Sequence, residues 1–360
     1  MTKISRGTVL ILIFTLVLFL GIQTDSAWAK DKPVKLKVGG IFPPPSTSLM
    51  SDILKHYCDE VTKRTNGQVT FQYFWGSALG SPPEHSELVK MGTAQVAQYH
   101  EWFTPAKFPL GDFEFVFPFG PTDYELVAKA MRQIHNEFPE FERDHRKQNM
   151  IQICDPPGGI YDFLSKIPVR TLKDFKGQKV SLIGRYFGKW LPPGATAVVR
   201  LGHERYDLLR SGVVKIDLLP FDLLYAFKLH EQTKYFIQTD LISCCWNNIV
   251  MNLDTFKGFS PEIQKIILDT GPYIEMQAAR EIIPRWRKRI EKEWKAAGIK
   301  TIVFPESEKK KWVKVIPDTP AMWAKEMEKK GYPGHKIVRR WQEITSDMGY
   351  KWPRRWDVQK

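Results

Sequence analysis

The chain has 360 residues, of which 43% are hydrophobic, and it carries a formal net charge of +13 at neutral pH. That length suggests two domains, because single hydrophobic cores stop growing at about 250–300 residues. The basic residues are spread along the chain and are densest at 285–314, so we interpret them as a solvated face and expect no nucleic-acid partner. An attraction to anionic lipid heads or to an acidic partner surface is the alternative.

The first 29 residues have the pattern of a secretory signal peptide. Lys3 and Arg6 give a positive start, residues 9–22 are apolar, and residues 27–29 read Ala-Trp-Ala, a small-x-small cleavage site. The apolar stretch is shorter than the roughly 20 residues that span a bilayer, which favours cleavage near Ala29 over a retained anchor. We therefore expect an exported, periplasmic protein.

Four cysteines occur in the chain, at positions 58, 154, 244 and 245. An oxidising compartment permits disulfides, and four cysteines allow three complete pairings. Buried free thiols are the simpler expectation, and the sequence leaves the disulfide state open.

Strands and helices alternate over the first hundred mature residues. Residues 34–41, 68–74 and 95–99 are rich in β-branched or aromatic side chains and predict strands. A helix with apolar residues at helical spacing follows the first strand, and Ser81 with Glu84 three residues later predicts a capping box that opens a second helix. This order predicts a parallel sheet built from two βαβ units.

The middle of the chain contains two places where it should pass between domains. Thr122 and Glu125 predict a capping box for a helix that runs to about residue 138, and residues 150–154 predict a strand. The next five residues, 155–159, read Asp-Pro-Pro-Gly-Gly and cannot continue a strand, so we place the first crossing there. The second crossing is expected at 240–246.

A long helix is predicted in the last third of the chain. Ser260 should cap a helix that Gly271-Pro272 breaks, and the long helix should follow from about residue 273 to 297, kinked at Pro284. Its apolar residues recur every four positions, which indicates a core-facing stripe. A strand at 300–304 follows, and the chain after Gly331 is expected to wrap the surface.

Several motifs occur in an order and at spacings typical of one protein family. They are Thr65-Asn66-Gly67, Leu79-Gly80, Glu84, Gly92-Thr93 through Ala97, the run Pro168–Val180, and the run Glu204–Val214. From about residue 36 to 343 the chain resembles the solute-binding proteins of TRAP transporters, the dicarboxylate-type receptor family. The order and spacing of the motifs carry the resemblance, and no single motif decides it.

The resemblance implies an α/β fold with two lobes, like that of periplasmic binding proteins. Each lobe would be a mostly parallel sheet flanked by helices, with a long helix bridging the lobes. The expected domains are a signal peptide at 1–29, lobe I at 30–157 with 245–285, lobe II at 158–244 with 286–345, and a tail at 346–360. The implied function is to capture a small organic molecule by hinge closure and deliver it to TRAP-type membrane permease subunits.

Ligands in open parallel sheets bind beyond the carboxyl ends of the strands, and that rule nominates residues 41–42, 75, 100–103, 182–190 and 218–222. Each nominated side chain has a structural alternative, in which it simply packs under its neighbours. The candidate ligand-binding residues, including those placed by the resemblance, are Phe42, Trp75, Tyr99, His100, Trp102, Tyr161, Ser181, Arg185 and Leu219.

The chain departs from the family at the residues that usually hold a carboxylate. Ser181 and Tyr161 stand where two arginines are common, and Leu219 stands near the usual asparagine. We therefore expect weak binding of simple C4-dicarboxylates and a ligand with an aromatic or apolar body, with any single anionic group held by Arg185. Arg200 and Arg205 are alternative cations.

The sequence contains none of the common local motifs of catalysis, metal binding or phosphate binding. We expect no catalytic residues, no metal and no cofactor, and a monomer. Two alternatives stay open: a secreted hydrolase or isomerase with dispersed catalytic residues, and a ligand sensor for a membrane receptor.

Overall fold

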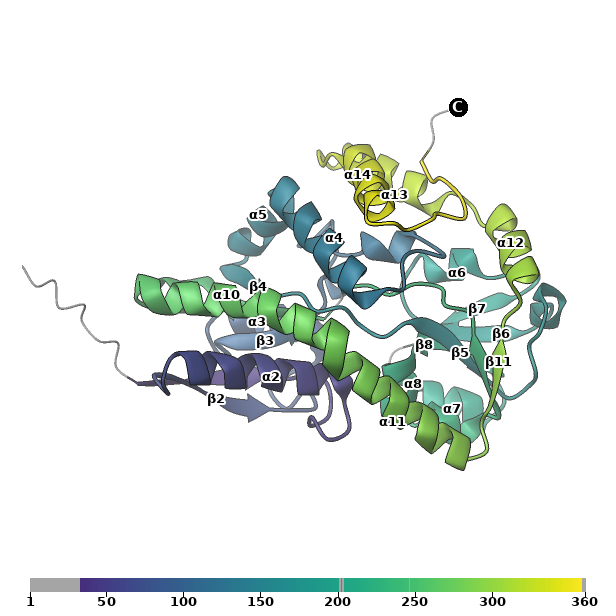
Figure 1. Cartoon of the computed structure of the whole chain (residues 1–360), viewed down its shortest axis with the longest axis horizontal. Helices are drawn as coiled ribbons and strands as arrows, with labels where there is room; N and C mark the ends of the chain where they lie inside the picture. Colours follow the sequence, from purple (N-terminus) through teal and green to yellow (C-terminus); the bar gives the residue numbers. More distant parts are fainter. Residues whose placement is uncertain (1–32, 201, 203, 246, 358–360) are drawn as a thin grey trace, which may run out of the picture. The chain divides into compact units, whose positions relative to one another are not determined.

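Two mixed β-sheets with helices on their faces make up the computed structural model, which describes residues 33–200, 202, 204–245 and 247–357 (Figure 1). The predicted signal peptide and its cleavage site lie outside these residues. Pro33–Lys360 form one compact unit. No helix in the described part of the chain is both long enough and apolar enough to cross a bilayer.

The first sheet has five strands in the order β2-β1-β3-β10-β4. β1 pairs in parallel with β2 and β3, whereas β10 runs antiparallel to its neighbours β3 and β4. The sheet therefore keeps the predicted parallel βαβ units and receives one reversed strand. Its strands are β1 (Val34–Gly39), β2 (Val69–Phe74), β3 (Val96–Tyr99), β4 (Met150–Cys154) and β10 (Asn248–Asn252).

The second sheet has six strands in the order β11-β9-β5-β8-β6-β7. Here β5 is the reversed strand, antiparallel to β8 and β9, while the other pairings are parallel. Both sheets are thus mostly parallel, as expected. The strands are β5 (Tyr161–Ser165), β6 (Lys179–Leu182), β7 (Thr196–Val199), β8 (Ile216–Pro220), β9 (Tyr235–Gln238) and β11 (Lys300–Val303).

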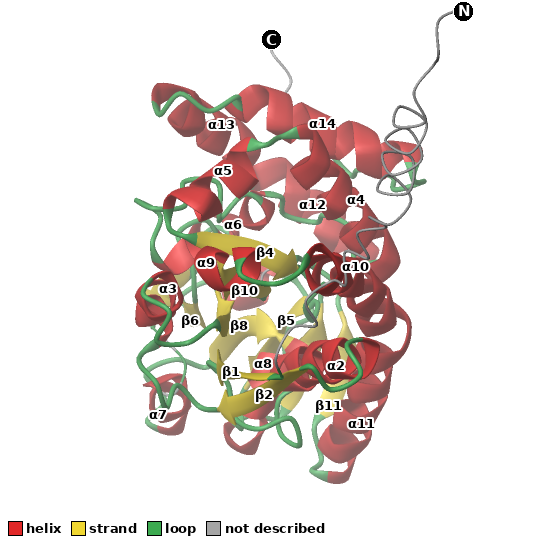
Figure 2. Ribbon diagram, turned by 90° about the vertical axis from the view of Figure 1, so that its left-hand side faces the viewer, coloured by secondary structure: helices red, strands yellow, loops and turns green. Residues whose placement is uncertain are grey.

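Helices flank the strands of both sheets (Figure 2). The α-helices are α2 (Leu49–Arg64), α3 (His85–Lys90), α4 (Tyr124–Glu137), α5 (Glu140–Lys147), α6 (Phe187–Trp190), α7 (Glu204–Arg210), α8 (Phe221–Ala226), α9 (Leu253–Lys257), α10 (Pro261–Gln277), α11 (Ile283–Ala296), α12 (Glu306–Val315), α13 (Thr319–Lys329) and α14 (Gly334–Asp347). Short 3₁₀ turns are η1 (Pro82–Glu84), η2 (Glu101–Phe103), η3 (Glu114–Val116), η4 (Leu172–Phe175) and η5 (Leu229–Gln232).

The chain crosses between the sheets where the sequence predicted. β4 belongs to the first sheet and β5 to the second, so the first crossing contains the Pro/Gly cluster at 155–159. β9 and β10 belong to different sheets, so the second crossing contains 240–245, while residue 246 lies outside the described residues. The strand that follows each crossing is the reversed strand of the sheet it enters. The domain boundaries within this arrangement stay a prediction.

The long bridging helix exists, but it begins earlier than predicted. Gly271-Pro272 does not break it, because α10 continues through Pro272 to a π-helical turn, η6 (Ala278–Ile282), and then to α11 (Figure 1). Gly271 faces β4 so closely that an added Cβ would lie 2.2 Å from the carbonyl oxygen of Ile153. The glycine therefore permits close helix–strand packing. The π-turn precedes Pro284, where the sequence predicted a kink.

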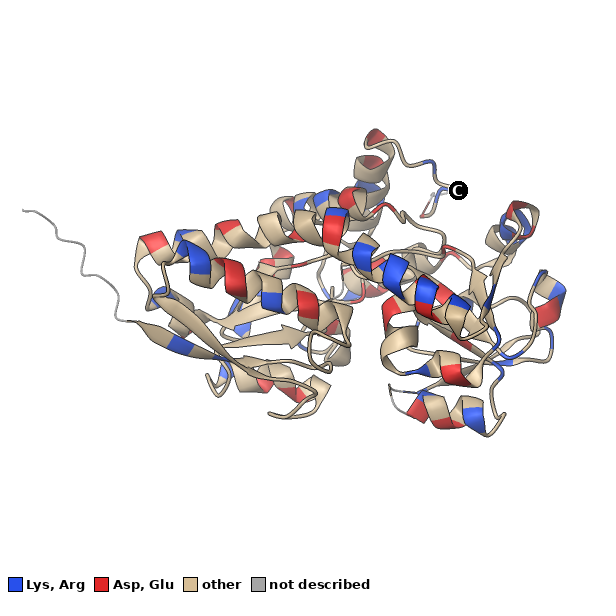
Figure 3. Ribbon diagram, turned by 60° about the horizontal axis from the view of Figure 1, so that its bottom comes forward, with Lys and Arg blue, Asp and Glu red and all other residues tan. Residues whose placement is uncertain are grey.

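The predicted apolar stripe of this helix is confirmed. Trp286, Ile290 and Trp294 of α11 are buried. Lys288 and Arg289 between them are exposed, and acidic residues alternate with basic ones along the helix (Figure 3), whereas Arg287 is mostly buried and lies 3.6 Å from Asp162. Arg289, for example, pairs with Glu293 at 2.9 Å. The basic run is thus a solvated face with local ion pairs, which contribute little to stability individually.

Two further details differ from the prediction. The cap of α4 is Asp123 rather than Thr122, since the Asp123 carboxylate accepts from the Leu126 N–H at 2.9 Å. The chain after Gly331 does more than wrap the surface, because α14 packs on α4 and α13 and buries Trp341. The Ser81–Glu84 capping box forms as predicted.

Candidate functional site

A pocket of about 420 Å³ lies among segments that leave strands of both sheets. Trp102 in η2 follows β3 and Phe115 lies in η3, while Tyr161 opens β5 and Phe187 opens α6 just after β6. This is the position that the strand-end rule predicts for a ligand. The complete lining is Trp102, Pro105, Asp112, Phe115, Tyr161, Ile183, Gly184, Arg185, Tyr186, Phe187 and Val199.

Four aromatic rings form a continuous wall of this pocket. Tyr161 and Phe187 stack with their centroids 4.7 Å apart, and Phe115 stands edge-on to both at 6.1 and 5.7 Å. Trp102 meets Phe115 edge-on at 6.3 Å, and its indole N–H has no hydrogen-bond partner among the described residues. The wall can remove apolar ligand surface from water, which gains roughly 25 cal/mol per Å².

Arg185 lines the pocket but is already held by two carboxylates. Its Nε donates to Asp112 Oδ2 at 2.7 Å, and its Nη1 donates to both carboxylate oxygens of Glu326 at 2.9 Å. Asp112 also accepts from the Trp323 indole at 2.8 Å, and Glu326 accepts from Lys330 at 2.8 Å. The guanidinium is therefore part of a four-residue ionic network that includes Lys330.

The pKa shifts in the network follow from burial and from these contacts. Burial raises the pKa of Asp112, although Arg185 and the Trp323 N–H oppose the shift. Partial burial alone would raise the pKa of Glu326, but hydrogen bonds from Lys330 and Arg185 outweigh it and lower that pKa. Burial also raises the pKa of Tyr161 well above its usual value, so its hydroxyl stays neutral.

Five of the predicted site residues lie in or directly behind this pocket. Trp102, Tyr161 and Arg185 line it. His100 is buried and stacks on Trp102 with centroids 6.1 Å apart, and Phe42 packs on His100 at 5.7 Å. His100 and Phe42 therefore support the indole from behind.

The structure places the other four predicted residues away from the pocket lining. Tyr99 is buried in β3 with its hydroxyl bonded to Thr104, and Trp75 stacks on Tyr73 at 5.0 Å. Ser181 in β6 and Leu219 in β8 are buried within the second sheet. Their part in ligand binding stays a prediction.

Arg205 forms a buried ion pair with Asp217, the residue that pairs with Ser181 between β6 and β8. It is fully buried and donates to both oxygens of Asp217, from Nε at 3.0 Å and from Nη2 at 2.6 Å. Asp217 lies opposite Ser181 across the β6–β8 pairing. Burial raises the pKa of Asp217 while Arg205 opposes it. This arginine is paired within lobe II and does not line the pocket.

Sequence reasoning missed several lining residues. Phe187, Tyr186 and Ile183 fell inside a nominated range without being singled out, and Phe115 belongs to an aromatic run whose role was not recognised. Asp112, Pro105 and Val199 carry no local signal, because only the folded chain brings them beside Tyr161.

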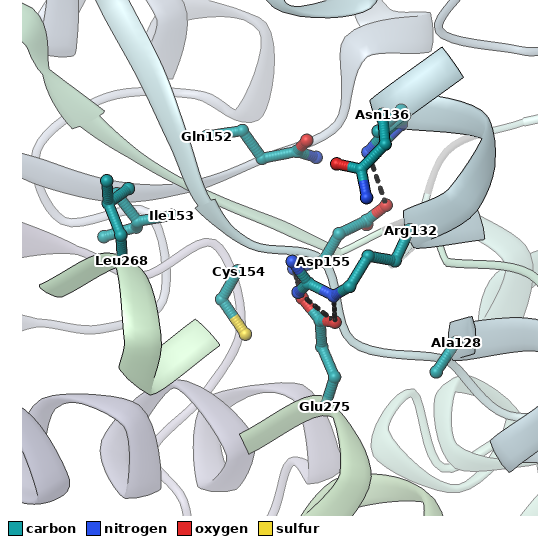
Figure 4. A pocket seen from close by; sticks show the side chains of 10 residues that line it. Ala128, Arg132, Asn136, Gln152, Ile153, Cys154, Asp155, Leu268 and Glu275 are labelled. Carbon is teal, nitrogen blue, oxygen red and sulfur yellow. Dashed lines mark hydrogen bonds and ion pairs between the residues drawn. The ribbon is translucent and has the colours of Figure 1, made fainter. Parts of the chain in front are cut away.

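A second cavity, of about 160 Å³, lies beside the first crossing (Figure 4). Arg132 of α4 reaches Glu275 of α10 there, with Nε–Oε2 at 3.1 Å, and Asp155 lies next to this pair. Burial raises the pKa of Asp155 well above its usual range, and the nearby Glu114 raises it further. The cavity is small and lined largely by charged and polar groups.

Buried carboxylates hold the crossings in place. Glu275 accepts from the Asp155 N–H at 2.8 Å, and Glu114 accepts from the Cys245 N–H at 2.6 Å. Glu101 accepts from the Asn248 amide at 2.6 Å. These bonds connect the first crossing to the bridging helix and fix the second crossing and β10 to residues that follow β3.

None of three remaining features makes a stronger candidate. The described residues contain no group of three or more His, Cys, Asp or Glu side chains arranged to hold a metal. All four cysteines are buried and unpaired. A hollow of about 480 Å³ is bounded only by elements around the second sheet, at Gln238, Glu291, Trp294, Lys295, Ile299 and Thr301.

Comparison with known families agrees with this architecture. The model of the bacterial extracellular solute-binding proteins, family 7, matches residues 40–329. The chain belongs to this family. Its resemblance to TRAP solute-binding proteins is therefore confirmed. Members of the family bind small organic ligands in the periplasm and work with TRAP permeases.

Solved structures share the two-lobe fold. A TRAP solute-binding protein from Rhodoferax ferrireducens, in complex with copurified benzoate, is 20% identical with a TM-score of 0.75, over 87% of this chain and 98% of that one. One from Desulfovibrio salexigens with bound orotic acid is 22% identical with a TM-score of 0.72, over 87% and 99%. A Bordetella pertussis receptor binding pyroglutamic acid is 17% identical with a TM-score of 0.72, over 86% and 99%.

Proposed function

We propose that this solute-binding protein captures a small organic molecule with a flat aromatic or apolar body in the pocket between Trp102 and Phe187. The single observation that carries the proposal is the pocket of about 420 Å³. Its aromatic wall is built from residues next to strands of both sheets. A ligand that touches rings from both lobes binds the closed form more tightly than the open form, and that difference drives closure.

The ring-shaped ligands of two structural relatives support this proposal. The relatives' structures contain benzoate and orotic acid, each a planar ring. Pockets of several hundred Å³ with a predominantly apolar lining are the usual sites for such molecules. In this chain Trp102, Phe115, Tyr161 and Phe187 supply that lining.

The chain acts, in this proposal, as a monomer that is exported, cleaved near Ala29, and docked by TRAP permease subunits that accept the ligand. It neither turns the ligand over nor needs a cofactor, metal or nucleic acid. What supports this is the lining, whose described residues are mostly aromatic or apolar and include no Ser, Thr, Cys, Lys or His.

Native mass spectrometry of the mature protein tests the function. We expect one organic molecule per chain, recovered chemically unchanged after denaturation and displaced by excess of the same compound. A protein with no bound molecule that fails to respond to any ring compound in a thermal-shift panel contradicts the proposal. Catalytic conversion of the bound molecule contradicts it in favour of an enzyme.

A further inference from the structure

Among the described residues, the charges of the ionic network around Arg185 are already balanced without a ligand. Arg185 is the one cation among the described lining residues, and it faces Asp112 at 2.7 Å and Glu326 at 2.9 Å. Lys330 offsets the second of these carboxylates. Two cations and two carboxylates sum to zero, so a ligand carboxylate would bring a third negative charge to a guanidinium that already faces two.

The other two candidate arginines each face a carboxylate of their own. Arg205 is fully buried against Asp217 and donates to the Leu218 carbonyl, while its Nη1 has no hydrogen-bond partner among the described residues. Arg200, which follows the lining residue Val199 in the sequence, donates to the Val199 carbonyl at 2.8 Å and lies 4.0 Å from Glu204. Ser181 and Tyr161 are uncharged. An anionic group enclosed here would lose its hydration without gaining an unpaired cation.

Hydrogen-bond donors, in contrast, remain available to an uncharged acceptor. Trp102 lines the pocket, and its indole N–H, which is buried, has no partner among the described residues. The Tyr161 hydroxyl can donate or accept. A carbonyl, amide or hydroxyl oxygen on a ring matches these groups, because a neutral acceptor satisfies the donors without adding charge.

We propose that the preferred ligand is an uncharged ring compound with a carbonyl, amide or hydroxyl oxygen, rather than a carboxylic acid. This inference rests on the proposed function and narrows its ligand class. The proposed ligand is uncharged, whereas the structures of three relatives contain the acids benzoate, orotic acid and pyroglutamic acid.

Matched pairs of probes test the inference. Isothermal titration of the mature protein would compare benzamide with benzoate, orotamide with orotate, and 2-pyrrolidone with pyroglutamate. The neutral member of at least one pair should bind more than tenfold tighter than its acid. If the acids bind tighter, the inference fails while the solute-binding function stands. If no member of any pair binds, the inference fails, and the bound molecule found by native mass spectrometry decides the function separately.

A substitution in the ionic network around Arg185 gives a second test of the inference, read out as a change in ligand affinity. Glu326→Gln removes one of the two carboxylates that neutralise Arg185, so benzoate affinity should rise about tenfold while benzamide affinity stays the same. Glu328→Gln on the same helix is the control, since Glu328 is exposed and lies 3.8 Å from His335, away from the pocket. Equal acid-to-amide ratios in wild type and Glu326→Gln would overturn the proposal.

Discussion

Arg185 obtains its partners from distant parts of the chain. Asp112 is 73 residues away in the sequence and Glu326 is 141 residues away, yet both bond directly to its guanidinium. The position of Arg185 after β6 is readable from the strand pattern, and the structure places it at the pocket. Its pairing with Asp112 and Glu326 decides whether the guanidinium is free to bind an anionic ligand. No local sequence pattern predicts that pairing.

Asp222 is a buried carboxyl that should make stability depend on pH. Burial raises its pKa to about 7, although backbone N–H groups, including that of Gly159, oppose the shift. Between its unfolded value of 3.8 and about 7 the folded state holds a proton that the unfolded state has lost. The contribution of Asp222 to the free energy of unfolding is therefore fully present below pH 3.8, and it is lost as the pH rises toward 7.

Asp222→Asn isolates that contribution. Between pH 5 and 6 the wild type should lose about 1.3 kcal/mol of unfolding free energy relative to the variant, and the slope should fall to about half of its limiting value at pH 7. Urea denaturation at several pH values measures the difference, with Asp207→Asn as an exposed substitution control. A difference that does not change with pH would show that Asp222 is ionised in the folded protein.

At the scale of elements, most strands and helices were predictable because their signals are local. The apolar stripe of α2 and the Pro/Gly cluster before β5 follow from residue spacing and backbone chemistry. The predicted helix end at Gly271-Pro272 is wrong. Such a pair ends many helices, but in this chain it lies inside α10. The packing of α10 on β4 stabilises the helix and outweighs local propensity.

The close approach of α10 to β4 gives a direct test. Gly271→Ala would place a methyl group 2.2 Å from the Ile153 carbonyl oxygen, so helix and strand must separate. We expect a loss of about 1–3 kcal/mol in unfolding free energy. Gly258→Ala is the matched control, because its nearest neighbour would lie at an ordinary 3.4 Å. Equal stability of the two variants would contradict the packing argument.

For the whole molecule, the order of elements predicted two lobes and their crossings, and family membership confirms the fold. The candidate pocket was only partly predictable, because its lining combines strand ends from both sheets with residues such as Asp112 and Val199 that have no local signature. Tyr99 and Trp75 were nominated by the strand-end rule, but their contacts are with neighbouring side chains.

The position of a bound ligand tests the central claim most directly. A crystal structure of the mature protein with its copurified molecule, or with the tightest probe of the matched pairs, should show the ligand enclosed by Trp102, Tyr161 and Phe187. Its acceptor oxygen should lie within hydrogen-bond distance of the Trp102 indole or the Tyr161 hydroxyl. A ligand located instead in the cavity beside Arg132 and Asp155, or outside the ring wall, would contradict the account.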